Sequence, residues 1–90
     1  MTNIVILGGA RTAIGGFGGS LAGTTPIELG TTVARAAIDR SGITADQINQ
    51  VGFGHVINTE PKDMYVSRVA AMQAGVPDTV PAMNVNRLCG

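Results

Sequence analysis

The sequence predicts an α/β fold with a mostly parallel sheet and the element order strand, helix, strand, helix, strand. Residues 4–7 form an uninterrupted aliphatic run, which is typical of a strand buried on both faces of a parallel sheet. Residues 50–57 alternate apolar and polar positions as a half-buried strand does. Segments with helical spacing of apolar residues separate the strands. This alternation predicts right-handed crossovers between parallel strands.

The first strand, residues 4–7, ends at a pair of glycines and leads into a glycine-rich stretch, residues 8–23. We expect that stretch to be a packed loop, because it is too rich in glycine for a long helix. Thr25, Pro26 and Glu28 then predict a helix start, with an N-cap, a proline at the first helical position and a completed capping box.

The first helix is expected to run for roughly four turns and to end at Gly42 in the left-handed conformation. Thr44 and Gln47 repeat the capping pattern for a short helical turn. The second strand follows at residues 50–57, with Val51, Phe53, His55 and Ile57 on one face.

The second half of the chain begins with a polar loop at residues 58–62. A helix is predicted at residues 64–74, with Gly75 as its stop. Ala82 to Asn86 form the third predicted strand, with Met83 and Val85 on one face. The chain ends four residues later, so we expect the sheet to pack against a missing remainder or a partner chain.

Composition and charge exclude several classes of function. The net charge is zero and Lys62 is the only lysine, so no basic stripe is available for nucleic acid or anionic lipid. No apolar run approaches the roughly 20 residues of a membrane span, and no signal-peptide pattern is found, which predicts a cytoplasmic protein. One cysteine and one histidine do not make a disulfide or a zinc site.

Most candidate site residues have an ordinary structural interpretation. The segment from Gly16 to Leu21 fails the GxGxxG nucleotide-binding pattern at its last position. His55 is interpreted as an interior or interface histidine. Glu60 and Asp63, which flank Lys62, are expected to be solvated.

Cys89 differs through its setting. It follows a strand and a short turn, where the next α/β element is expected to be a helix. A helix N-terminus lowers a cysteine pKa, and its free N–H groups, that of Cys89 included, can receive an oxyanion. From the residues alone, a nucleophilic cysteine and an inert buried cysteine both remain open.

The stretch from Val80 to Gly90 resembles the segment around the nucleophilic cysteine of thiolases. In the segment Arg11-Thr12-Ala13, which also resembles the family, the commonest family form has proline at the position of Ala13. Further resemblances follow in family order: Arg11-Thr12-Ala13-Ile14-Gly15, Phe17-Gly18-Gly19-Ser20-Leu21, Glu28-Leu29-Gly30, Gly52-Phe53-Gly54-His55-Val56 and Arg68-Val69-Ala70-Ala71.

This resemblance implies an acyltransferase that carries the acyl group on Cys89 and uses coenzyme A esters as substrates, without metal or organic cofactor. It implies a dimer or tetramer of chains with two similar halves and a loop domain. Residues 1–90 would then be an incomplete N-terminal thiolase domain, the first β-α-β-α-β part. A histidine and a second cysteine serve the family as further catalytic groups, and neither matches a position in this chain.

The loop from Thr59 to Tyr65 resembles that of bacterial β-ketothiolases. This likeness implies a bacterial enzyme of acetoacetyl-CoA or 3-ketoacyl-CoA metabolism, and with it a role in fatty acid metabolism. Two alternatives are a β-ketoacyl synthase-like condensing enzyme and a non-catalytic thiolase-like protein that binds acyl-CoA. The first would depend on acyl carrier protein, and the second would bind CoA esters without acylating a thiol.

Overall fold

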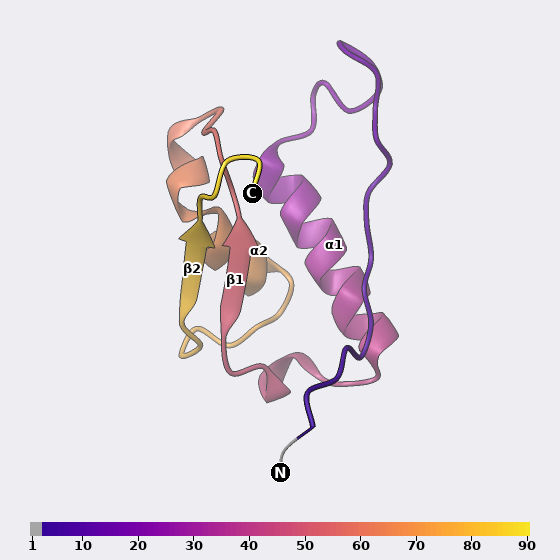
Figure 1. Cartoon of the computed structure of the whole chain (residues 1–90), viewed down its shortest axis with the longest axis vertical. Coiled ribbons are helices and arrows are strands. Elements are labelled where there is room, and N and C mark those ends of the chain that lie inside the picture. Colours follow the sequence, from indigo (N-terminus) through magenta and orange to yellow (C-terminus); the bar gives the residue numbers. More distant parts are fainter. Residues whose placement is uncertain (1–2) are drawn as a thin grey trace.

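The fold is a small α/β arrangement in which one helix covers one face of a two-stranded parallel sheet and a longer helix packs against that helix (Figure 1). A computed structural model describes residues 3–90. Its main elements are α1 (Pro26–Ser41), β1 (Val51–Gly54), α2 (Val66–Gln73) and β2 (Ala82–Val85). Short 3-10 turns at Ala45–Gln47 and Pro61–Tyr65 precede β1 and α2.

Helix α1 begins and ends as the sequence predicts. The Thr25 hydroxyl accepts the Glu28 N–H at 3.1 Å, and the Glu28 carboxylate accepts the Thr25 N–H at 3.1 Å. Pro26 occupies the first turn, where its missing N–H costs nothing. Gly42 caps the C-terminus at φ 76°, a conformation that glycine adopts without steric cost. The capping prediction is confirmed at both ends.

The two strands are parallel, as predicted, with Val51 opposite Ala82 and Gly54 opposite Val85. Both are shorter than the predicted ranges. Val51 and Phe53 of β1 are half-buried, whereas the intervening glycines are exposed. In β2, Met83 and Val85 share a face as predicted, and these two residues are 51% and 40% exposed, respectively. The sheet therefore has one covered and one open face.

Close packing of the helices on the sheet centres on Gly30. A Cβ at this position would lie 3.0 Å from Phe53 Cε2 and 3.2 Å from Ala70 Cβ. The absence of a side chain therefore lets α1 approach both β1 and α2. Gln73 adds polar links between the helices, since its side chain accepts the Thr31 hydroxyl at 3.0 Å and its carbonyl accepts an Arg35 N–H at 2.6 Å.

The second helix is tied to β2 by Asn84. Instead of one helix from residue 64 to 74, a 3-10 turn at Pro61–Tyr65 leads into α2. The Asn84 side chain accepts the Ser67 N–H at 3.0 Å and donates to the Met64 carbonyl at 2.9 Å. Gly75, at φ 102°, follows the helix end as predicted. Asn84 thus fixes the N-terminal end of α2 against the sheet.

The predicted first strand is wrong for this structure. Residues 4–7 form no strand, and Ile4 and Ile6 are 96% and 95% exposed. A strand is stabilised by its neighbours, and no strand within residues 3–90 pairs with this segment. The segment instead runs past the C-terminal end of α1, where Arg40 donates to the Gly9 carbonyl at 3.4 Å.

The prediction of a packed loop at residues 8–23 is also wrong. The segment has turns after Gly16, with backbone bonds from the Gly19 N–H to the Gly16 carbonyl and from the Ala22 N–H to the Gly19 carbonyl. Phe17 is fully exposed and Ile14 is 95% exposed. Its apolar side chains contribute nothing to the buried core.

We expect the isolated 90-residue chain to lack a cooperative thermal transition and to bind the dye ANS. Within residues 3–90, six apolar residues are buried, two of them alanines, while fourteen large apolar residues are at least 40% exposed. So little burial does not offset the conformational entropy of ordering the chain. Calorimetry and ANS fluorescence check this expectation. A sharp melt with dispersed amide resonances would contradict it.

Candidate active site

Cys89 lies in a closed turn just beyond the carboxyl end of β2. Figure 1 shows the C-terminal segment continuing from the arrowhead of β2. The Gly90 N–H donates to the Arg87 carbonyl at 2.8 Å and closes the turn. Cys89 is exposed and has no disulfide partner. The turn thus presents a free thiol at the end of a parallel strand, the edge where ligands bind in α/β sheets.

The backbone of this turn is unusual at two positions. Leu88 has φ 52°, in the left-handed region that a leucine rarely adopts. A Cβ at Gly90 would lie 3.0 Å from the Arg87 carbonyl oxygen, a tight contact that would require a shift of a few tenths of an ångström. Residues 87–90 form only this turn. The helix expected after Cys89 therefore stays a prediction.

Asn86 connects the turn to the segment that follows β1. Its side-chain oxygen accepts the Leu88 N–H at 3.0 Å, and its amide donates to the Val56 carbonyl at 3.2 Å. Asn86 is not among the site residues that the sequence predicts. Its signal is an asparagine two positions before the residue whose N–H it binds, the spacing of an Asx turn.

His55 lies at the end of β1 on the half-buried face. Its Nε2 lies 2.8 Å from the Asn58 side-chain oxygen, so the loop that follows β1 supplies the ring with a hydrogen-bonding partner. The backbone N–H of His55 donates to the Val85 carbonyl at 2.9 Å and extends the pairing of the two strands by one residue. These contacts agree with the interpretation of His55 as a structural residue.

Asp63 is fully buried, so the expectation that it is solvated is wrong. Its Oδ2 accepts the Thr59 N–H at 2.6 Å, the Thr59 hydroxyl at 2.7 Å and the Glu60 N–H at 3.2 Å. Its Oδ1 is buried without a partner among the described residues. Its sequence signal is the order Glu60-Pro61-x-Asp63, which is typical of a helix start, although the polar composition predicts a loop.

The hydrogen bond from the Thr59 hydroxyl holds the pKa of the Asp63 carboxyl below its ordinary value of 3.8. The backbone N–H groups of Thr59 and Glu60 and the nearby His55 lower this pKa further, whereas burial works in the opposite direction. Asp63 therefore serves the loop as a carboxylate that accepts several hydrogen bonds. Within residues 3–90 no group of three potential metal ligands is found.

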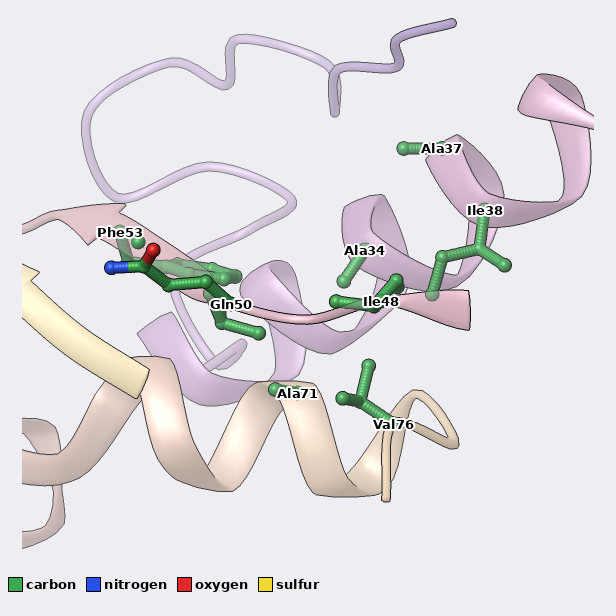
Figure 2. Close-up of a pocket in the computed structure, with 10 residues that line it drawn as sticks. Ala34, Ala37, Ile38, Ile48, Gln50, Phe53, Ala71 and Val76 are labelled. Carbon is green, nitrogen blue, oxygen red and sulfur yellow. The ribbon is translucent and has the colours of Figure 1, made fainter. Parts of the chain in front are cut away.

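The cavity drawn in Figure 2 lies away from Cys89. It measures about 310 Å³ and sits between α1, α2 and the edge of β1 that does not face β2. Figure 2 shows mostly apolar side chains around it, and none of the lining residues is titratable or nucleophilic. We interpret it as incompletely filled core. Its lining residues are Ala34, Ala37, Ile38, Ile48, Gln50, Val51, Gly52, Phe53, Ala71 and Val76.

A second cavity, of about 300 Å³, lies at the carboxyl end of the sheet. It is bordered by the loop before α1 and by Thr59 and Glu60 of the loop after β1. The start of α1, the loop holding Asp63 and the start of α2 therefore meet at the edge from which the Cys89 turn leaves. Cys89 does not line this cavity.

No helix within residues 3–90 is long and apolar enough to cross a membrane.

Comparison with known proteins identifies the family. Residues 4–90 match the family model described as thiolase, N-terminal domain. The chain belongs to the thiolase family. Beta-ketothiolase BktB of Cupriavidus necator is 53% identical over 87 residues, which are 97% of this chain and 22% of that protein. An acetyl-CoA acetyltransferase of the same organism is 46% identical over 90 residues, all of this chain and 23% of that protein.

Solved structures show the thiolase fold as well. The human mitochondrial 3-ketoacyl-CoA thiolase matches with a TM-score of 0.90 and 30% identity, over 93% of this chain and 21% of that chain. The Bacillus anthracis acetyl-CoA acetyltransferase matches with a TM-score of 0.85 and 38% identity, over 94% of this chain and 21% of that chain. The chain therefore has a thiolase-like α/β fold and spans about a fifth of the length of these relatives.

A chimaeric enzyme allows this chain to be measured within a relative of greater length. In it, residues 1–90 replace the matching region of beta-ketothiolase BktB, and we call it the chimaeric thiolase.

In the chimaeric thiolase, we expect the stabilising effect of Asp63 to disappear at low pH. Because the folded state lowers the pKa of this carboxyl, its contribution is complete above pH 3.8 and is lost as the pH falls through the folded-state value. The difference in melting temperature between the parent and Asp63→Asn should be constant from pH 7 to 5 and shrink below pH 4. A difference that grows as the pH falls would contradict this.

Proposed function

We propose that Cys89 is the acyl-carrying nucleophile of a thiolase. The observation that carries this proposal is the exposed thiol in a closed turn at the carboxyl end of a parallel strand, in a chain that belongs to the thiolase family. An acyl carrier must be reachable by a large substrate and must be held rigidly enough to meet its carbonyl carbon. The Cys89 turn satisfies both requirements.

In the proposed reaction, the Cys89 thiolate attacks the thioester carbonyl of an acyl-CoA. The bond from that carbon to the CoA sulfur breaks, and CoA leaves as a thiolate that takes up a proton. When a 3-ketoacyl-CoA is cleaved, Cys89 attacks the ketone carbon, and the carbon–carbon bond breaks. Its electron pair leaves with acetyl-CoA, which takes up a proton.

The acyl group then passes from sulfur to a second substrate. The thiolate of CoA accepts it in the direction of cleavage. In the direction of synthesis, the α-carbon of a second acetyl-CoA gives up a proton and accepts it to form acetoacetyl-CoA, and in both directions the bond from the acyl carbon to the Cys89 sulfur breaks and the Cys89 thiolate is released. Because a thioester on sulfur keeps the acyl carbon activated toward nucleophiles, the acyl group can pass from Cys89 to either acceptor. The order predicts ping-pong kinetics.

The proposed reaction also needs catalytic side chains that residues 1–90 do not supply. Cys89 is its only cysteine and His55 lies in a different motif, so a catalytic histidine and a second cysteine would come from outside residues 1–90. We propose that the complete protein is a cytoplasmic dimer or tetramer that needs no metal or organic cofactor. Coenzyme A esters would be its substrates.

Acyl labelling tests the nucleophile directly. The chimaeric thiolase is mixed with acetyl-CoA, quenched in acid and digested, and the acetyl mass is sought by peptide mass spectrometry. We expect it on the peptide that contains Cys89, and we expect no label there in Cys89→Ala. Acetylation confined to another residue would overturn the proposal.

A further inference from the structure

We propose that Asn86 is a positioning residue that fixes the turn presenting Cys89, an inference that rests on the proposed role of Cys89. The pairing of β1 and β2 ends with the bond from the His55 N–H to the Val85 carbonyl at 2.9 Å. One residue later, the Asn86 amide donates to the Val56 carbonyl at 3.2 Å. A side chain thus continues the pairing where the backbone of β2 leaves the sheet.

The other end of the same carboxamide controls the turn. Its oxygen accepts the Leu88 N–H at 3.0 Å, and Leu88 has φ 52°. A leucine adopts this region at a steric cost and keeps it only where its surroundings hold it. The Asn86 oxygen and the closing bond from Gly90 to Arg87 hold it here. Without Asn86, Leu88 is free to relax and to carry the neighbouring Cys89 with it.

Asparagine is required because both bonds are made at once. The carboxamide offers one donor and one acceptor, whereas aspartate offers two acceptors. In Asn86→Asp the side chain keeps its shape and its bond to the Leu88 N–H. It loses the donor and places a negative charge beside the Val56 carbonyl oxygen. This isosteric change therefore detaches the turn from β1 with the least disturbance to packing.

Asn84, which lies two residues earlier within β2, provides a matched control. It makes the same kind of paired contacts, to the Ser67 N–H and the Met64 carbonyl, but these anchor α2 rather than the turn. It is half-buried, whereas Asn86 is exposed. Asn84→Ala should therefore affect stability more than Asn86→Ala does, and acylation of Cys89 less.

The experiment compares Asn86→Asp, Asn86→Ala and Asn84→Ala in the chimaeric thiolase. The measurements are the single-turnover rate of Cys89 acetylation by acetyl-CoA, the KM for acetyl-CoA and the melting temperature. A misplacement of about 1 Å at a reacting group costs on the order of a hundredfold in rate. We expect a loss of about that size in both Asn86 variants, with KM within a few fold of the parent. In Asn84→Ala we expect a lower melting temperature and a near-parental rate in the folded fraction.

The outcomes separate this inference from the proposed function. If the parent is acetylated at Cys89 and the Asn86 variants are acetylated at its rate, Asn86 has no positioning role and the function stands. Rates that merely follow the melting temperature across all three variants would also overturn the inference. Acetylation that persists in Cys89→Ala would overturn the proposed function itself. Should Asn86→Ala fail to fold, the isosteric Asn86→Asp still decides between these results.

Discussion

Replacing Cys89 with alanine in the chimaeric thiolase is expected to lower kcat for thiolysis of acetoacetyl-CoA by about four to six orders of magnitude. Removing the nucleophile from a catalytic unit that acts as a whole has effects of this size in other enzymes. Cys89→Ser should lose nearly as much. A serine hydroxyl forms almost no alkoxide at neutral pH, whereas an unperturbed cysteine, with a pKa of about 8.5, already forms some thiolate. Steady-state kinetics of purified variants give the comparison.

Binding provides the control for this prediction. Because Cys89 is exposed and lies in a turn, its replacement should leave the fold and the affinity for acetyl-CoA nearly unchanged. Calorimetric titration and melting temperature check both. A Cys89→Ala enzyme with near-parental turnover would show that the thiol is not the nucleophile.

Side chains of increasing size at Gly30 are expected to destabilise the fold progressively. Glycine in a helix interior is less favourable than alanine or leucine by about 1 kcal/mol, so propensity alone predicts that both substitutions stabilise. Sterics predict the opposite, because a Cβ here already lies 3.0 Å from Phe53 and 3.2 Å from Ala70. Overpacking costs about 1–3 kcal/mol. We expect Gly30→Ala to range from nearly neutral to about 2 kcal/mol destabilising, and Gly30→Leu to exceed it.

The sign of the effect decides between the two explanations. Melting temperatures of the chimaeric thiolase with glycine, alanine and leucine at position 30 should fall in that order. A rise with both substitutions would mean that α1 can move away from Phe53 and Ala70 at little cost. The close approach of the helix would then be incidental.

Local signals were enough to predict the parts of the fold that local interactions determine. Thr25, Glu28 and Gly42 define α1 through contacts within one or two turns. The parallel pairing of β1 with β2 also follows from the element order. Residues 4–7 could not be predicted this way, because an aliphatic run becomes a strand only beside a partner that the pattern does not name.

The candidate site was predictable where its residue type is chemically unusual. The setting of Cys89 after a predicted strand left a nucleophile and an inert buried cysteine both open, and the resemblance to thiolases favoured the nucleophile; the structure places the thiol in an exposed position. Asp63 was missed because burial of a carboxylate depends on where Thr59 and Glu60 direct their donors, which a polar sequence does not reveal. Asn86 was missed because one of its two bonds reaches Val56, thirty residues earlier in the chain.

The left-handed leucine beside Cys89 implies a trade-off between stability and function. Glycine at position 88 would adopt φ 52° without steric cost, yet it would give the turn many more conformations. Leucine costs the folded state some free energy and, once held by its neighbours, leaves the backbone a narrower range of motion. The segment thus combines a glycine in a tight position, Gly90, with a leucine at a position where glycine would cost less strain but allow more motion. Selection for thermostability alone would favour replacing that leucine, and selection for a well-placed thiol would retain it.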